Sequence, residues 1–331
     1  MHIPDNYLSP STCAVLGTAM VPVWATSIKK IKAEIPKEKI PLLGIGAAFS
    51  FLGMMFNIPL PGGTTGHAVG GTLIAALCGP YAACISVTIA LFVQALLFGD
   101  GGILAFGANC FNMAFVLPFV GYMVSEVLKR YLKGKHADKI AAGIGAYLGI
   151  NAAALCAAIE FGIQPLLFKD SAGNALYCPY SLSVSIPAMA LGHLTVFGAA
   201  EVIFTVAVLV FMQKAAPDMV YEKKGKTAKP VYLLLGALII LTPLGLLATG
   251  TAWGEWGTDE IAEVVSGGTA LGYTPKGMAE GFRFSALFSD YSVAGMPEWL
   301  GYMLSAVVGA ALVVIFFKII SSLKKSRVEF D

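Results

Sequence analysis

The sequence predicts an all-α, polytopic membrane protein: a bundle of seven membrane helices followed by a two-helix hairpin. Of its 331 residues, 57% are hydrophobic and only 13% are charged, and the mean hydropathy is +0.75. A soluble domain typically carries about 25% charged residues. The composition therefore excludes an ordinary soluble domain, and the net charge of +2 gives no reason to expect a nucleic-acid partner.

Eight apolar runs are long enough to cross the hydrocarbon core of a bilayer, which takes roughly 20 helical residues. A ninth segment, residues 66–79, is apolar but would form a helix only about 21 Å long. We expect it to cross as a short helix that begins below the membrane surface and is entered from a buried loop. The eight longer runs lie near residues 8–30, 40–56, 81–98, 106–132, 140–163, 186–213, 230–249 and 298–320.

The placement of Lys and Arg predicts the orientation. With nine crossings and the N-terminus outside, the cytoplasmic segments hold 19 of the 22 basic residues, and only Lys169, Lys276 and Arg283 lie outside. This asymmetry is the one that the positive-inside rule describes. We therefore expect a multi-pass protein of the cell inner (plasma) membrane with an extracellular or periplasmic N-terminus.

A basic, hydrophilic linker predicts a division of the chain. We expect residues 1–213 to form the seven-helix unit, residues 214–230 to form a cytoplasmic linker, and residues 231–331 to form the hairpin with an acidic external loop at 250–297. Within the linker, Gly225-Lys226-Thr227 resembles the end of a phosphate-binding loop, but Val220 stands where the Walker pattern needs Gly. The chain is therefore not expected to be an ATP-hydrolysing enzyme.

The first two residues could bind a metal ion. A bulky second residue such as His2 generally prevents removal of the initiator Met1, so a free amine would lie one peptide bond from an imidazole. The amine, the deprotonated His2 amide and the His2 ring could then chelate a cation in one plane, which suits Ni(II), Cu(II) or tetragonal Co(II). The alternative is a disordered polar chain end, which is the more common fate of a terminus.

His67 could supply a fourth nitrogen. It follows a Gly-rich stretch, residues 59–66, on the external side, and irregular backbone persists at membrane depth only where protein or a cavity covers it. The loop could therefore deliver an imidazole below the surface. A loop whose His only satisfies a neighbouring carbonyl is an equally good interpretation of these residues alone.

Five polar residues lie in the outer third of the predicted spans. Intramembrane polar groups usually face the bundle interior and mark a site or pathway, where they could orient metal-bound imidazoles. Hydrogen bonds that only hold helices together are at least as good an explanation for any one of them, and this structural role is the one expected for the deeper Asn151 and Glu201. The five candidates are Gln94, Asn109, Asn112, Glu160 and His193.

Four stretches resemble the CbiM/NikM family, the metal-binding S components of energy-coupling factor nickel and cobalt transporters. They are MHIPDNYLSP, PLPGGTTGHAVGG, QALLFGDGGILAFGANCFNMA and the region from His193 to Glu201. The resemblance implies that the Met1 amine, the His2 amide and ring, and the His67 ring bind the metal. It also implies a transmembrane T component and two ABC-type ATPase subunits as partners. One departure is Asn6, where the family usually has Gly; Asn tolerates the left-handed backbone well.

The last hundred residues, in which TPLGLLATGTAWGEWG enters the external loop, resemble the small two-helix N subunit of these systems fused to the chain. The resemblance implies a metal-capture subunit of an ATP-driven importer, with Ni²⁺ as the expected ligand, Co²⁺ next, and no cofactor. The alternatives are cobalt uptake for cobalamin biosynthesis, a secondary metal/proton transporter, or an enzyme that uses the bound metal. A proton-coupled transporter would need ionisable residues through the full membrane thickness, and a catalytic metal would need an open coordination position.

Overall fold

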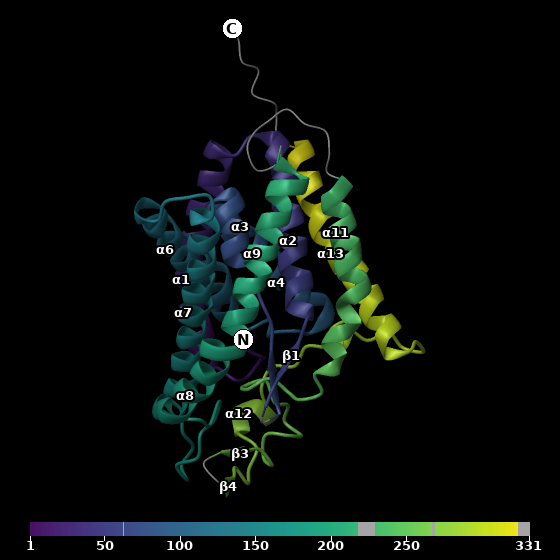
Figure 1. Ribbon diagram of the computed structural model, residues 1–331. Helices are drawn as coiled ribbons and strands as arrows, with labels where there is room; N and C mark the ends of the chain where they lie inside the picture. Colours follow the sequence, from purple (N-terminus) through teal and green to yellow (C-terminus); the bar gives the residue numbers. More distant parts are fainter. Residues whose placement is uncertain (62, 218–228, 267–268, 324–331) are drawn as a thin grey trace.

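The computed structural model describes residues 1–61, 63–217, 229–266 and 269–323, and in them the chain forms a bundle of helices with two short strand pairs at one end (Figure 1). Eight helical segments in the described residues are long and apolar enough to cross a membrane. The prediction of a polytopic, helical membrane protein is confirmed. The eight are α1 (Pro10–Glu34), α2 (Ile40–Met55) with η1 (Lys37–Lys39), α4 (Pro80–Val93) with η2 (Gln94–Phe98), α5 (Phe106–Asn109) with η3 (Cys110–Val116) and α6 (Leu117–Tyr131), α7 (Ala137–Leu167), α8 (Leu182–Gly192) with η4 (His193–Phe197) and α9 (Gly198–Ala215), α11 (Lys229–Leu241) with η5 (Thr242–Leu247), and α13 (Glu298–Leu323).

The start of α1 leaves the first nine residues outside any helix. Ser9 is the N-cap, its hydroxyl accepts a hydrogen bond from Thr12 N at 3.1 Å, and Pro10 occupies the first helical turn. Ser at the cap and Pro directly after it are a strong helix start, because Pro has no N–H to leave unpaired there. Residues 1–9 are therefore free to enter the bundle as non-helical chain.

The short ninth helix is real, but it begins later than expected. Residues 64–66 form strand β2 (Thr64–Gly66), which pairs with β1 (Ile58–Leu60), and helix α3 covers only Gly71–Cys78. Gly70 has φ 73°, and a Cβ there would lie 2.8 Å from the Phe204 ring, so the backbone turns in the left-handed region before the helix begins. The expected helix start at residue 66 is wrong for this reason, and residues 67–70 form the buried entry loop.

Helix α3 carries the chain from the strand pair to the opposite end of the bundle. Its last residue, Cys78, lines one cavity together with Lys30 and Lys39 from the basic ends of α1 and η1. Since α3 alone is only about 12 Å long, the entry loop and the helix together bring the chain to this end, and the crossing of the ninth segment stays a prediction.

The C-terminal region packs against the rest of the bundle. Helix α13 lies along α2, where a Cβ on Gly44 would lie 3.0 Å from Phe317 and one on Gly309 would overlap the Phe51 ring. The loop between η5 and α13, residues 248–297, covers the end of the bundle near the N-terminus and holds β3 (Val265–Ser266), β4 (Thr269–Ala270), α12 (Lys276–Ala279) and η6 (Ser289–Tyr291) (Figure 1). The described residues do not include 218–228, which hold most of the predicted linker and the Gly225-Lys226-Thr227 stretch, or 324–331. The division at 214–230 therefore stays a prediction.

Candidate metal site

The N-terminal segment is buried and ordered rather than free. Met1, His2 and Ile3 are at most 6% exposed. The Asn109 side chain holds the segment by its main chain: Ile3 N donates to Asn109 Oδ1 at 2.7 Å, and Asn109 Nδ2 donates to Ile3 O at 3.0 Å. The interpretation of residues 1 and 2 as a disordered chain end is therefore wrong.

Asp5 fastens the same segment to the Gly-rich turn after η2. Its carboxylate accepts hydrogen bonds from Ile103 N at 3.0 Å and Leu104 N at 2.7 Å, and Gly102 N donates to Ile3 O at 2.9 Å. A Cβ on Gly102 would lie 2.3 Å from Asp5 Oδ1, so only Gly allows this approach. Together with Asn109, these contacts fix the direction in which Met1 and His2 point.

The loop that carries His67 is held from below by Glu201 on α9. The Glu201 carboxylate accepts hydrogen bonds from Val69 N at 2.7 Å and from Gly70 N at 3.0 and 3.1 Å. A carboxylate that accepts several backbone N–H groups holds a loop tightly. The structural role expected for Glu201 is therefore one of positioning the His67 loop.

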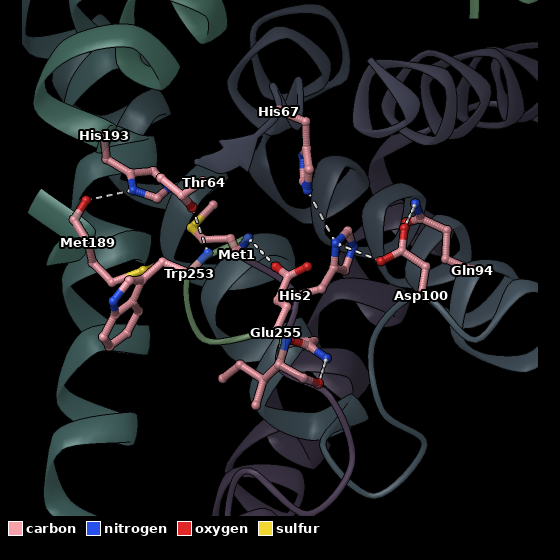
Figure 2. A network of polar contacts seen from close by, with 12 residues as sticks. Met1, His2, Thr64, His67, Gln94, Asp100, Met189, His193, Trp253 and Glu255 are labelled. Atoms are coloured by element: carbon pink, nitrogen blue, oxygen red, sulfur yellow. Dashed lines mark hydrogen bonds and ion pairs between the residues drawn. The ribbon is translucent and has the colours of Figure 1, made fainter. Parts of the chain in front are cut away.

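The two imidazoles meet beside the N-terminal amine (Figure 2). His2 Nδ1 lies 3.2 Å from His67 Nε2, the ring centroids are 4.9 Å apart, and the side chains are 3% and 7% exposed. The Met1 amine donates to Glu255 Oε1 at 3.0 Å, and His2 Nδ1 also lies 3.1 Å from Asp100 Oδ1. The structure thus brings together all three residues that the sequence proposed as ligands.

Burial keeps both imidazoles uncharged. Burial first, and the nearby Met1 amine second, lower the pKa of His2 to about 4, although the Glu255 carboxylate and the Gln94 side chain partly oppose them. Burial likewise lowers the pKa of His67 well below its usual value. Neutral imidazoles have a lone pair available for a metal ion.

Main-chain nitrogens are needed to complete a metal site here. Among the described residues, no group of three or more His, Cys, Asp or Glu side chains could hold a metal ion. The available nitrogen donors are the Met1 amine, the His2 amide and the two rings. Such a set of nitrogens suits a divalent first-row transition metal rather than Ca²⁺ or Mg²⁺, which prefer oxygen.

The five outer polar residues divide into two groups. Four of them lie in a π-helical turn or directly before one: Gln94 in η2, Asn109 before η3, Asn112 in η3 and His193 in η4. Glu160 lies in α7, an ordinary α-helix. π turns often mark functional sites. Gln94 and Asn109 reach the site: Asn109 holds Ile3, and Gln94 Nε2 donates to Asp100 Oδ2 at 3.1 Å.

The other three residues have different partners. Asn112 Nδ2 donates to Glu160 Oε2 at 2.8 Å, and His193 Nδ1 lies 2.8 Å from Met189 O. Within the described part of the chain, no hydrogen bond joins Asn112, Glu160 or His193 to His2 or His67. Their role in orienting the ligands stays a prediction.

Sequence reasoning missed two acidic residues at the site, Asp100 and Glu255. Asp100 stands in the Gly-rich stretch after η2, where Tyr291 OH donates to its Oδ2 at 2.5 Å, and burial raises its pKa. Glu255 stands between two Trp residues in the acidic loop. The Gly residues on either side of Asp100 are the sequence feature that could have marked it as a site residue. Nothing local distinguishes Glu255 from the other acidic residues of its loop.

Known proteins resemble the chain over its whole length. The profile of the cobalt uptake substrate-specific transmembrane region, CbiM, matches residues 2–219, and that of the PDGLE domain matches residues 228–326. The probable fused nickel transport protein LarMN of Lactiplantibacillus plantarum is 51% identical over 98% of both chains, and the fused nickel transport protein NikMN of Rhodobacter capsulatus is 48% identical over 95% of both.

More distant and partial matches agree. A cobalt transport protein CbiM of Streptococcus sanguinis is 35% identical over 59% of this chain and 81% of its own. A crystal structure of a transition metal transporter, 53% identical, aligns with a TM-score of 0.62 over 68% of this chain and all of its own. The chain is therefore a multi-pass membrane protein of the CbiM family, with a PDGLE domain fused after its CbiM region.

Proposed function

We propose that this protein is the substrate-specific metal-capture subunit of an ATP-driven, energy-coupling factor importer, and that it binds its ion through the Met1 amine, the His2 amide and ring, and the His67 ring. The observation that carries the proposal is the 3.2 Å separation of His2 Nδ1 and His67 Nε2 beside a buried amine. Adjacent nitrogens bound to one ion at about 2 Å lie about 2.8 Å apart in a square plane. Only a small adjustment therefore separates the metal-free arrangement from a chelate.

The donor set and the relatives favour nickel. Four nitrogens in one plane suit Ni(II) first and tetragonal Co(II) next. Two relatives that match nearly the whole chain are named nickel transport proteins, whereas the matching cobalt transport protein of Streptococcus sanguinis covers 59% of it. We therefore assign Ni²⁺ as the transported ion, with Co²⁺, for instance for cobalamin biosynthesis, as the alternative.

Gln94 is suited to orient the bound His2 ring. Once Nδ1 binds a metal ion, the remaining N–H of the ring is on Nε2, and it needs an acceptor. His2 Nε2 and Gln94 Oε1 are both buried, and neither has a hydrogen-bond partner in the described residues. The Gln94 side chain is nevertheless close enough to raise the pKa of His2, so a slight movement would pair the two atoms.

Energy for import would come from other subunits. The sequence has no complete Walker motif, and its resemblance to S components implies a transmembrane T component and two ABC-type ATPases. We place the protein in the plasma membrane with the N-terminus outside, because the basic residues gather on the opposite side. Co-purification of the untagged chain with an ATPase tests this assignment, and purification without one from cells that take up metal would contradict it.

Metal analysis tests the binding site directly. The protein is purified with an unmodified N-terminus, exposed to equal concentrations of Ni²⁺, Co²⁺ and Zn²⁺, desalted, and analysed by mass spectrometry for metal content. We expect about one Ni²⁺ per chain for the wild type and almost none for His67→Ala, which removes one nitrogen of four. Equal nickel content in the two proteins would refute the site.

A further inference from the structure

The acidic loop of residues 248–297 contacts both chain segments that carry the proposed ligands. Trp253 N donates to Thr64 Oγ1 at 2.8 Å, in the strand that precedes His67. Tyr7 OH, in the N-terminal segment, donates to Trp256 O at 2.9 Å. The stretch from Trp253 to Trp256 therefore bridges the two halves of the site, although it belongs to the C-terminal region.

Glu255, in the middle of this stretch, is aimed at the N-terminal amine. Its Oε1 lies 3.0 Å from the amine, and the side chains of Met1 and Glu255 are 1% and 22% exposed (Figure 2). A buried ammonium group needs a hydrogen-bonded partner of opposite charge. In the metal-free protein, Glu255 is that partner.

The backbone around Glu255 is built to hold it there. Gly254 has φ 83°, and a Cβ on it would lie 2.9 Å from the Phe161 ring, so the chain makes a tight turn against α7 that favours Gly. The rings of Trp253 and Trp256 are 5.8 Å apart and both contact Tyr180, at 5.4 and 5.6 Å between centroids. These contacts restrict the positions that the Glu255 carboxylate can occupy.

We propose that Glu255 is part of the metal site as the counter-charge of the bound ion, an inference that rests on the function proposed above. An ion bound to the Met1 nitrogen at about 2 Å cannot lie farther than about 5 Å from Glu255 Oε1 if the side chain stays in place. At that distance, and largely shielded from water, a carboxylate attracts a divalent cation strongly. The C-terminal region thus contributes to metal affinity by a specific residue and does more than cover the bundle.

Other acidic residues of the loop do not share this position. Glu260 contacts the Thr251 hydroxyl at 3.0 Å and is exposed, and Glu280 lies 3.8 Å from Lys276 at the surface. Glu260 is therefore a matched control: it is the same residue type in the same loop, five positions away, and faces solvent.

The test uses the full chain with its native N-terminus. Ni²⁺ affinity is measured by competition with a chromophoric chelator, and the ligand-field absorption spectrum of the nickel-bound protein is recorded. The variant Glu255→Gln removes the charge but keeps an oxygen that can accept a hydrogen bond from the amine. We expect its affinity to fall by about 10-fold or more, the effect typical of groups that support metal ligands, with an unchanged spectrum and with wild-type affinity in Glu260→Gln. Glu255→Asp, which keeps the charge, should recover most of the loss.

Two results would overturn the proposal. Wild-type affinity in Glu255→Gln would show that the charge does not act on the ion. An altered spectrum would show that Glu255 is a direct ligand or that it shapes the donor set, and not a counter-charge. Failure of the wild type itself to bind Ni²⁺ is a distinct result, because it refutes the proposed function before Glu255 is considered.

Discussion

Replacing Asn109 with Leu should release the N-terminal segment from the bundle. The side chain is 2% exposed and pairs with both main-chain groups of Ile3, at 2.7 and 3.0 Å. Leu has a similar size, so the change removes hydrogen bonds without opening a large cavity. Ile3 O keeps its hydrogen bond from Gly102 N at 2.9 Å, whereas Ile3 N loses its partner. A buried polar group without a partner costs about 1–3 kcal/mol in the docked state.

The substitution destabilises the docked state and not the undocked one, because water can form a hydrogen bond with Ile3 N only when the segment has left the bundle. Since about 1.4 kcal/mol corresponds to a factor of ten, even the lower bound of about 1 kcal/mol raises the undocked fraction about fivefold. Hydrogen–deuterium exchange of the metal-free protein measures this directly, because amides exchange through such local openings. We expect the peptide that contains residues 1–9 to exchange at least about fivefold faster than in the wild type.

Asn151→Leu is the matched control. The Asn151 side chain donates to Tyr147 O within α7, at 2.8 Å, and does not touch the N-terminal segment. Its removal should leave exchange of residues 1–9 unchanged. If the N-terminal peptide of Asn109→Leu exchanges within about threefold of the wild type while the helices stay protected, the reasoning about this clamp is wrong.

Three further predictions concern the proposed chelate. His2→Ala and His67→Ala should each abolish uptake while the protein stays in the membrane, as checked by radioactive nickel uptake and immunoblotting; near-normal uptake by either would refute its role. A tag before Met1 that offers no His of its own should also abolish uptake, whereas the same tag after Asp331 should not; equal transport with the tag verified by mass spectrometry would exclude the amine. Acidification below about pH 6.5 should also weaken nickel binding. Burial lowers the pKa of docked His2 to about 4, whereas an undocked His2 is protonated below about pH 6.5, so acid favours the undocked segment, which cannot bind the ion. Affinities measured by calorimetry that stay constant from pH 7.5 to 5 would contradict this.

The membrane helices could be predicted well because the bilayer allows few alternatives. A chain in hydrocarbon must satisfy its backbone internally, so a long apolar run is a helix, and the run at 298–320 is indeed α13, Glu298–Leu323. The start of α3 could not be predicted, because it depends on Gly70 turning against Phe204, 134 positions later in the chain. Local sequence shows only that Gly is present and not which conformation it adopts.

The ligands could be proposed because their chemistry is local. Met1 and His2 are adjacent, and one peptide unit is enough to suggest a chelate. The groups that support them are distant in sequence: Asn109 is 106 positions from Ile3, and Glu255 is 254 positions from Met1. Among six acidic residues in one loop, no local pattern separates Glu255 from Glu260, and only the fold does so.

Asn6 shows how a correct local argument can be incomplete. Its φ of 67° confirms that this position needs the left-handed backbone, which explains why Asn is tolerated where the family usually has Gly. The side chain also pairs with the C-terminal loop: Asn6 Nδ2 donates to Phe282 O at 2.8 Å, and Phe282 N donates to Asn6 Oδ1 at 2.9 Å. Gly would lack both bonds, so Asn6 does more at this position than tolerate the backbone conformation.

The buried carboxylates of the spans argue against a metal/proton exchanger. Such a mechanism needs groups that pass protons through the membrane, and Glu201 is the deepest acidic candidate. Both of its oxygens accept backbone N–H groups from Val69 and Gly70, so a proton on Glu201 would weaken the hold on the loop that presents His67. Glu160 lies near the C-terminal end of α7 and accepts a hydrogen bond from Asn112 Nδ2. In the described residues these carboxylates hold the His67 loop and the helices in place, which is what a capture site requires and a proton relay does not.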